Sequence, residues 1–352
     1  MSTCRGVVFP GDGTYEIQQF PIPEPGPGGA VLKVEAVGLC ASDVSQLHGH
    51  HHVPGEVSPV VPGHEIVGRV HALADDADLG VEVGQRVGVD LVLFGGRPDS
   101  GLDVYGYTIG PDVDHGLWGG YGEYMGVLPN THLVALTDDV PAAELSLFEP
   151  LASIVNWSDM LELAPHDRLV IQGPGHMGLI AAAYASSQIG VRQIIVTGTS
   201  RDGLRLEAAK AVGAHEVIDV DDEADLVGRI RDLTGGGPSA VMELTALATK
   251  PVSDAIEMAG FGGRILIAGL KDERPVEIVS DQLVFKMLRM MGGSGSTADT
   301  MTRAGEVLNS GTFPTAELLG ETYTLDELDE AMAMLERRID GRDAVRVGLV
   351  HP

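Results

Sequence analysis

The sequence predicts an α/β protein in which a doubly wound parallel sheet follows a β-rich N-terminal segment. Two observations lead to this prediction. A glycine-rich turn within LVIQGPGHMG, residues 169–178, joins a strand-like apolar run to an alanine-rich helical run. From residue 168 onward, strand-like and helix-like segments alternate, which is typical of a parallel sheet with helices on both faces.

The N-terminal segment lacks strong helical patterns. Its predicted strands alternate apolar and polar residues, as half-buried strands do. They lie at 6–9, 30–37, 65–73, 85–89 and 124–127, with a turn-rich stretch at 21–29. Helical periodicity begins only near Pro141. We therefore expect a β-rich domain at the start of the chain.

The segment after residue 168 predicts six strands with interleaved helices, as a doubly wound sheet requires. The strands are expected at 169–173, 193–197, 216–219, 239–244, 263–268 and 288–292. The helices are expected near 176–189, 203–212, 223–234, 248–260 and 275–286. Helices at 298–309 and 325–338 and a strand at 344–350 complete the prediction.

The turn at 173–178 has the G-x-G-x-x-G pattern of dinucleotide-binding proteins. Gly173 allows the tight turn, Gly175 lets the backbone approach a pyrophosphate, and Gly178 lets the helix pack against the strand. The N-terminus of the helix then presents unpaired N–H groups to the phosphates. The alternative is an ordinary strand–turn–helix, which the following strand at 193–197 disfavours because it completes a βαβ unit.

The residues after the second strand of this unit bear on the choice between NAD and NADP. An NAD-specific unit places an acidic residue about 20 positions past the fingerprint, where this chain has Gly198. A glycine leaves room for a 2′-phosphate, which Thr199, Ser200 and Arg201 can bind. In the alternative, Asp202 folds back to the ribose and Arg201 faces solvent. The prediction leans to NADP(H). The predicted cofactor-binding residues are Gly173, Gly175, His176, Met177, Gly178, Gly198, Thr199, Ser200, Arg201 and Arg205.

Composition excludes several classes of protein. A net charge of −28 opposes binding to nucleic acid or anionic membranes, which requires a positive face. We find no signal-like N-terminus and no apolar run that could span a bilayer, and we expect a cytoplasmic protein. The two cysteines, Cys4 and Cys40, are too few for a disulfide framework and indicate a reducing compartment. Cys40 is therefore free for chemistry.

Three residues from separate segments predict a zinc site. Cys40 lies in GLCASD, His64 in PGHEIVGRV and Glu149 in FEPLAS. A thiolate, an imidazole and a carboxylate with a vacant fourth position make a zinc site of the catalytic kind. Each residue also has a structural interpretation, namely a buried apolar thiol, a turn histidine and a surface helix carboxylate.

The succession of motifs decides between these interpretations. GLCASD, PGHEIVGRV, VGQRV at 83–87, GGYGEYM at 119–125 and the glycine fingerprint occur in this order. Over essentially the whole chain they resemble the zinc-dependent medium-chain dehydrogenase/reductase family, that of alcohol and sorbitol dehydrogenases. PGHE followed by a glycine three residues on is the most specific part of the resemblance.

The resemblance implies a GroES-like catalytic domain built from both chain ends, 1–155 and 296–352, around a Rossmann domain at 156–295. It implies Cys40, His64 and Glu149 as zinc ligands. It places Glu65 beside the metal or as an alternate ligand, and it makes Ser42 the catalytic hydroxyl that takes the alcohol proton.

Two departures from the family pattern matter. Many members hold a structural zinc on four cysteines, between the third and fourth of these motifs. This chain has no cysteine after Cys40, so we expect one catalytic zinc and no structural zinc. The relay histidine often found five residues after the zinc cysteine is Ser45 here. The histidines that can replace it as a proton exit, or simply form a polar loop, are His48, His50, His51 and His52.

These observations predict a zinc-dependent oxidoreductase that transfers hydride between NAD(P) and a secondary, polyol or cyclic alcohol or its ketone. Trp118, Tyr121 and Trp157 offer either an apolar wall for the substrate or core packing. The alternatives are a zinc-free quinone or enone reductase of the same superfamily and a non-enzymatic nucleotide-binding protein. As the family forms both, a homodimer or a homotetramer is expected.

Overall fold

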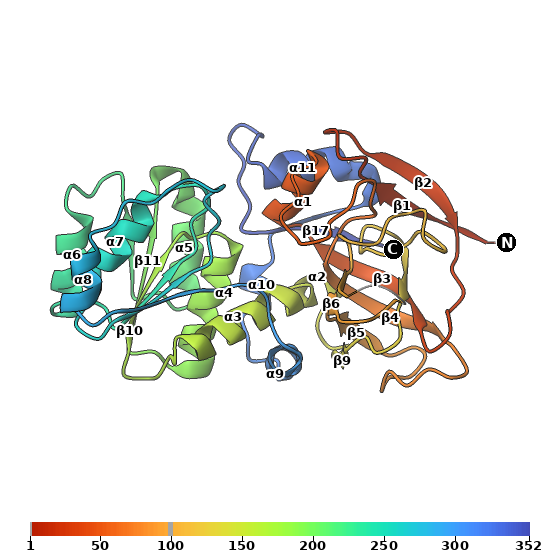
Figure 1. Ribbon diagram of the computed structural model, residues 1–352, viewed down its shortest axis with the longest axis horizontal. Helices are drawn as coiled ribbons and strands as arrows, with labels where there is room; N and C mark the ends of the chain where they lie inside the picture. Colours follow the sequence, from red (N-terminus) through yellow and green to blue (C-terminus); the bar gives the residue numbers. More distant parts are fainter. Residues whose placement is uncertain (1, 98–100) are drawn as a thin grey trace. The chain divides into compact units, whose positions relative to one another are not determined.

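The computed structural model describes residues 2–97 and 101–352, which form two compact units (Figure 1). One unit, here called the mixed-sheet unit, comprises Met1–Glu149, Met301–Gly311 and Leu319–Pro352. The other, the parallel-sheet unit, comprises Pro150–Thr300 and Thr312–Leu318. None of the helices in the described part of the chain is both long and apolar enough to cross a bilayer.

The parallel-sheet unit has the predicted doubly wound sheet. Its strands are β10 (Arg168–Gln172), β11 (Gln193–Gly198), β12 (Glu216–Asp219), β13 (Ala240–Glu243), β14 (Arg264–Ile267) and β15 (Arg289–Gly292). All six are parallel, in the order β12-β11-β10-β13-β14-β15. Leu169, Val170 and Ile171 of β10 are fully buried, because helices cover both faces of the sheet at its centre. The fold class is thereby confirmed.

The helices of this unit form two layers. They are α3 (Phe148–Met160), α4 (His176–Tyr184), a π-helical turn η1 (Ala185–Ile189), a 3₁₀ turn η2 (Ser200–Asp202), α5 (Gly203–Ala211), α6 (Leu226–Thr234), α7 (Lys250–Met258), α8 (Ser280–Phe285) and α10 (Thr315–Leu318). Helix α4 packs against α5, and α6 packs against α7. Right-handed crossovers that run in opposite directions from β10 place these two pairs on opposite faces.

Helix α8 is shorter than the predicted segment 275–286. No residue of α8 is buried, so no packing extends it toward Pro275. Helix α10 was not predicted, because its four residues are too few to show a periodic pattern.

The mixed-sheet unit is built on a seven-stranded sheet. Its strands are β3 (Ala30–Gly38), β4 (Glu65–Leu73), β5 (Arg86–Val89), β8 (Tyr124–Val127), β9 (Leu133–Ala135), β16 (Glu321–Tyr323) and β17 (Val347–Val350). Two hairpins flank it, β1 (Thr3–Val8) with β2 (Glu16–Pro21) and β6 (Val92–Leu93) with β7 (Asp103–Val104). Strand β17 pairs with β3, so the end of the chain joins the sheet formed by its beginning.

In the described part of this unit, five helical segments accompany the sheet. They are α1 (Ala41–Leu47), α2 (Ala142–Leu145), α9 (Ala298–Asn309), the 3₁₀ turn η3 (Leu325–Glu327) and α11 (Leu328–Leu335). The expectation that helices begin only near Pro141 was wrong for α1. Its seven residues span two turns at most, too short for a periodic pattern, and its start is set by Asp43 in the first turn.

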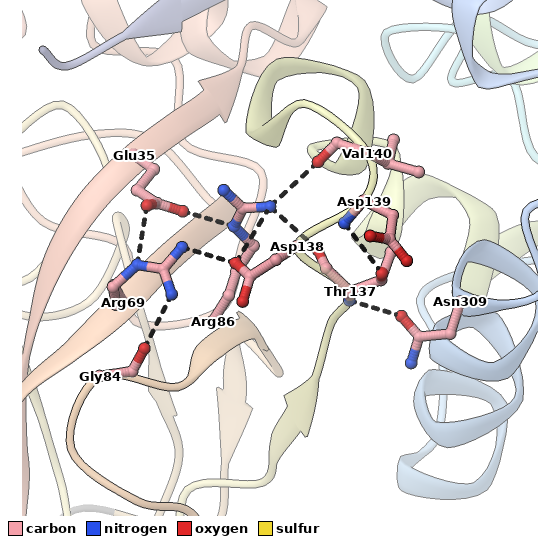
Figure 2. A network of polar contacts seen from close by, with 9 residues as sticks. All are labelled: Glu35, Arg69, Gly84, Arg86, Thr137, Asp138, Asp139, Val140 and Asn309. Carbon is pink, nitrogen blue, oxygen red and sulfur yellow. Dashed lines mark hydrogen bonds and ion pairs between the residues drawn. The ribbon is translucent and has the colours of Figure 1, made fainter.

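A polar network ties three strands of this sheet together (Figure 2). Arg69 on β4 and Arg86 on β5 are register partners, so their positive charges lie side by side. Glu35 on β3 accepts from both, at 3.0 Å from Arg69 Nε and 2.6 Å from Arg86 Nε. Thr137 N donates to Asn309 Oδ1 at 2.8 Å, which attaches α9 to the same region. The Glu35 carboxylate thus offsets the repulsion between the Arg69 and Arg86 guanidinium groups on neighbouring strands.

The lobe, defined here as residues 94–97 and 101–118, contains an ion pair that joins its two described stretches. Arg97 Nε donates to Asp103 Oδ1 at 2.7 Å, and Arg97 N donates to Asp103 Oδ2 at 3.0 Å. Asp103 is only 1% exposed. Val104 N donates to Thr108 Oγ1 at 2.8 Å, which tightens the turn that follows β7.

Candidate active site

The register of β3 and β4 brings two of the predicted zinc ligands together. The two strands are antiparallel and their last pair is Gly38 with Glu65. Cys40, just after β3, and His64, just before β4, therefore lie at the same end of this strand pair. Cys40, His64 and Glu65 form the one group of possible metal ligands in the described part of the chain, with ligand atoms within 4.8 Å of one another. A thiolate, an imidazole and a carboxylate fit zinc.

Asp43 holds both of these ligands in place. Cys40 N donates to Asp43 Oδ2 at 2.8 Å, and Tyr121 Oη donates to the same oxygen at 3.1 Å. Asp43 Oδ1 lies 3.5 Å from His64 Nδ1. The Asp43 side chain is fully buried. Sequence reasoning missed this residue, although an acid at the third position of a helix that follows Cys40 is a recognisable capping signal.

Glu65 is buried against a cation from the other end of the chain. Arg346, which precedes β17, donates through Nη2 to Glu65 Oε2. The same guanidinium donates to Ser146 Oγ at 2.8 Å and to Ser146 O at 2.7 Å. A Cβ at Gly38 would lie 1.9 Å from both Arg346 Nη2 and Glu65 Oε2, so only glycine fits between them. Arg346 was not predicted, although a carboxylate as buried as Glu65 requires a counter-charge.

Ser42 is connected to a residue that sequence reasoning also missed. Tyr107 in the lobe donates from Oη to Ser42 Oγ at 2.8 Å. Its Oη lies 3.1 Å from His64 Nδ1. Burial raises the pKa of Tyr107 far above its ordinary value, so the phenol keeps its proton at neutral pH.

The four histidines that follow α1 are exposed. They are His48, His50, His51 and His52. Among the described residues, Ser42 is hydrogen-bonded to Tyr107 and to none of these histidines. His51 Nε2 is instead 3.1 Å from Ser58 Oγ. A role for one of them as the proton exit stays a prediction.

The surroundings of His64 favour a positive charge. Burial by itself lowers the pKa of His64, but Tyr107, Asp43 and Cys40 together raise it well above its ordinary value. Tyr107, Asp43 and Cys40 therefore stabilise a positive charge at this position, whether it belongs to a proton or to a metal ion.

Glu149 lies outside the group formed by Cys40, His64 and Glu65. It is the second residue of α3 and is partly buried. Its role as a ligand stays a prediction. Trp118 and Tyr121 belong to the buried core of the mixed-sheet unit, and Trp157 is 7% exposed. This burial favours core packing over a substrate wall for these three residues.

In the turn at 173–178, each glycine has the geometry that its predicted role requires. Gly173 has a φ of +101°, which favours glycine. A Cβ at Gly178 would lie 2.0 Å from Gly173 O, so helix α4 packs closely on β10 only with glycine there. A Cβ at Gly175 would meet nothing within 4 Å, which leaves space for a ligand at the N-terminus of α4. His176 and Met177 form the first turn of that helix. The turn fits a dinucleotide.

The loop after β11 is more constrained than its sequence suggests. A Cβ at Gly198 would lie 2.7 Å from Pro174 Cγ, so packing alone requires this glycine. Thr199 donates to Asp202 Oδ2 at 2.9 Å from N and at 2.7 Å from Oγ1. The predicted phosphate ligands Arg201, which is exposed, and Arg205, which is partly buried in α5, stay predictions.

Comparisons with known proteins agree with this geometry. A family model described as alcohol dehydrogenase GroES-like domain matches residues 26–138, and one described as zinc-binding dehydrogenase matches 177–310. A Mycobacterium tuberculosis protein named "probable alcohol dehydrogenase" is 32% identical over 97% of this chain and 96% of its own length. A sorbitol dehydrogenase from Halalkalibacterium halodurans is 28% identical over 91% and 92%, respectively. The structure of 2R,3R-butanediol dehydrogenase from Bacillus subtilis has a TM-score of 0.85 at 24% identity, covering 99% of this chain and 100% of its own.

Fold, site and matches together define a zinc-dependent, NAD(P)-linked oxidoreductase of alcohols. The chain belongs to the zinc-dependent medium-chain dehydrogenase/reductase family.

Proposed function

We propose that this chain interconverts a secondary, polyol or cyclic alcohol and its ketone, using one catalytic zinc held by Cys40, His64 and Glu149, with Glu65 beside it or as an alternate ligand. The observation that carries this proposal is the approach of Cys40, His64 and Glu65 to within 4.8 Å of one another at one edge of the mixed sheet. Glu149 lies outside this group and is proposed as a ligand from the family resemblance. The sorbitol dehydrogenase relative supports a secondary or polyol substrate.

The roles of the chain's own residues follow from their contacts. Bound zinc supplies a Lewis acid that lowers the pKa of an alcohol hydroxyl. Ser42 is the hydroxyl nearest the thiolate in sequence and is half-buried, so it hydrogen-bonds the reacting oxygen and passes its proton toward solvent. Asp43 keeps Cys40 and His64 in position, and Gly173, Gly175 and Gly178 hold the cofactor's pyrophosphate.

Metal analysis and an alcohol panel test this function. We expect about one zinc per chain by the ligand count and turnover of secondary alcohols or polyols. Cys40→Ala should remove both. Cys4→Ala is the matched control, because Cys4 is 3% exposed and burial raises the pKa of its thiol to about 11. Two zinc ions per chain, or full activity in Cys40→Ala, would refute the proposal. Enone turnover without zinc would instead identify a zinc-free reductase.

We further propose that the chain accepts both NAD(H) and NADP(H), with a modest preference for NADP(H). Gly198 carries no carboxylate to repel a 2′-phosphate, and the exposed Arg201 supports its binding. Ser200 limits the preference, because Oγ donates to Asp219 at 2.7 Å and N donates to Asp221 at 2.9 Å. The fold by itself does not determine whether NAD(H) or NADP(H) is bound. A structure from Escherichia coli at 23% identity holds NADH, and one from Sinorhizobium meliloti at 24% holds NADP.

We also propose that the chain forms a homodimer through the edge of its parallel sheet. Strand β15 is the last strand of that sheet and pairs only with β14 among the described strands. Val284 and Phe285 of α8 are 71% and 78% exposed, and Met290 of β15 is 41% exposed. A second copy covers such an edge by pairing β15 with itself about a two-fold axis.

A further inference from the structure

Tyr107 connects the proposed proton-transfer serine to a proposed zinc ligand. Its side chain is 5% exposed. Its Oη donates to Ser42 Oγ at 2.8 Å and lies 3.1 Å from His64 Nδ1. The rings of Tyr107 and His64 are stacked obliquely, with centroids 5.1 Å apart. Tyr107 comes from the lobe, not from any of the motifs that predicted the site.

The hydrogen bonds have a defined direction. His64 Nδ1 faces Asp43 Oδ1 at 3.5 Å, and a carboxylate only accepts, so Nδ1 carries the ring proton. Tyr107 gives its own proton to Ser42, and its oxygen therefore accepts from His64 Nδ1. The chain of donors runs from His64 through Tyr107 to Ser42.

This direction determines which nitrogen of His64 carries the proton and how the Ser42 hydroxyl is oriented. With its proton on Nδ1, His64 presents the Nε2 lone pair to a metal. With one lone pair taken by Tyr107, the Ser42 oxygen keeps its second lone pair to accept the alcohol proton and its own hydrogen to pass on. The hydrogen bond from Tyr107 thereby gives the Ser42 hydroxyl a defined orientation.

The lobe holds Tyr107 rigidly enough for this task. Gln46 Nε2 of α1 donates to Gly106 O at 2.8 Å, and Val57 N donates to Tyr107 O at 2.9 Å. Gly106 has a φ of +77°, and a Cβ there would lie 2.7 Å from Gly63 O. The turn is therefore hydrogen-bonded to α1, which carries Ser42, and packs against Gly63, the residue before His64.

We propose that Tyr107 is a positioning residue that aims the Ser42 hydroxyl at the reacting oxygen and presents His64 Nε2 to the metal. The proposal rests on the proposed function of Ser42 and His64. It accounts for a phenol in contact with two separate parts of the site.

The test compares Tyr107→Phe with Tyr105→Phe, which removes an equally buried phenol two residues away. Tyr105 is 1% exposed, and its Oη is hydrogen-bonded to Thr131 Oγ1 and Leu128 N, each at 2.7 Å. We expect Tyr107→Phe to lower kcat by about 10-fold, with KM changed by less than about 2-fold, and to speed zinc release to a chelator by about 10-fold. Tyr105→Phe should lower the unfolding temperature and leave kcat and zinc release near wild type.

A double variant distinguishes positioning from a general structural effect. In the Ser42→Ala background, Tyr107→Phe should change kcat by less than about 2-fold, because its route to the substrate is already removed. It should still speed zinc release through His64. Equal effects of Tyr105→Phe and Tyr107→Phe, or multiplied losses of kcat in the double variant, would overturn the proposal. If wild type binds zinc but oxidises no alcohol, the proposed function fails, and zinc release alone decides the role of Tyr107.

Discussion

At the scale of single residues, Glu65 is both a proposed neighbour of the zinc and one member of a buried ion pair with Arg346. Both side chains are at most 2% exposed, and Ser146 accepts hydrogen bonds from Nη1 and Nη2 of the guanidinium. Removing one partner leaves a buried charge without compensation, which costs far more than the net contribution of the pair. An activity loss in a Glu65 variant therefore has two causes that must be measured separately.

We expect Glu65→Ala to lower the free energy of unfolding by about 3–5 kcal/mol, the usual cost of leaving one member of a buried pair alone. Glu65→Gln should cost less, because an amide oxygen still accepts from Arg346. Urea unfolding followed by circular dichroism measures the difference. The control is Glu162→Ala, which breaks the exposed pair with Arg289 and should have little effect. Similar losses in Glu65→Ala and Glu162→Ala would contradict this account.

The same variants identify the carboxylate that binds zinc. If Glu149 is the ligand, Glu149→Ala should weaken zinc binding while unfolding in the metal-free state stays near that of wild type. Loss of Glu65 as a neighbour of the metal should weaken binding by about 10- to 100-fold. Zinc affinity measured by competition with a chelator gives both values. Unchanged zinc affinity in Glu149→Ala, together with loss in Glu65→Gln, would assign the site to Glu65 instead.

At the scale of elements, the proposed cofactor preference depends on opposing charges in the loop after β11. Asp219 accepts from Ser200 and lies at the end of β12, next to β11 in the sheet. Its negative charge opposes a 2′-phosphate, whereas Arg201 favours one.

We expect Asp219→Asn to raise the ratio of kcat/KM for NADP(H) over NAD(H), and Arg201→Ala to lower it by about 10-fold, the effect of one charged hydrogen bond. Steady-state kinetics with both cofactors on one alcohol checks this. A wild-type preference for NAD(H) that neither substitution alters would show that this loop does not contact a phosphate.

Strands were predictable from the sequence where their burial required a local run of apolar residues. Strands β12, β4 and β8 match their predicted ranges, and the remaining strands of the parallel sheet differ by a residue or so at their ends, because each is an apolar run between glycines or polar turns. Strand β2 was missed because five of its six residues are exposed. Cys40 and His64 were predictable from motifs. Tyr107 and Arg346 were not, since their contacts depend on how distant segments pack and leave no local pattern.

At the scale of the whole molecule, the proposed dimer rests on the exposed apolar edge of the parallel sheet. The edge strand β15 has four residues, and the apolar side chains of Val284, Phe285 and Met290 beside it are exposed unless another chain covers them. The net charge of −28 works against indiscriminate association, so a specific pairing is favoured.

We expect a dimer in solution by light scattering and a monomer after Met290→Lys, because a lysine on β15 opposes strand pairing. The control is Phe94→Lys, which removes a side chain that is 79% exposed in the mixed-sheet unit and should leave the dimer intact. A monomeric wild-type protein, or loss of the dimer in the control alone, would refute the pairing.

The lobe has one further consequence. It is closed by Arg97 and Asp103, and it carries Tyr107 to Ser42 and His64. An ion pair between side chains contains nothing that a chelator extracts or an oxidant consumes. Removing the metal should therefore leave the Arg97–Asp103 pair and the contacts of Tyr107 with Ser42 and His64 in place. We therefore expect zinc to reload such an apoenzyme without refolding, and exchange for cobalt or cadmium to give a practical route to spectroscopy of the site.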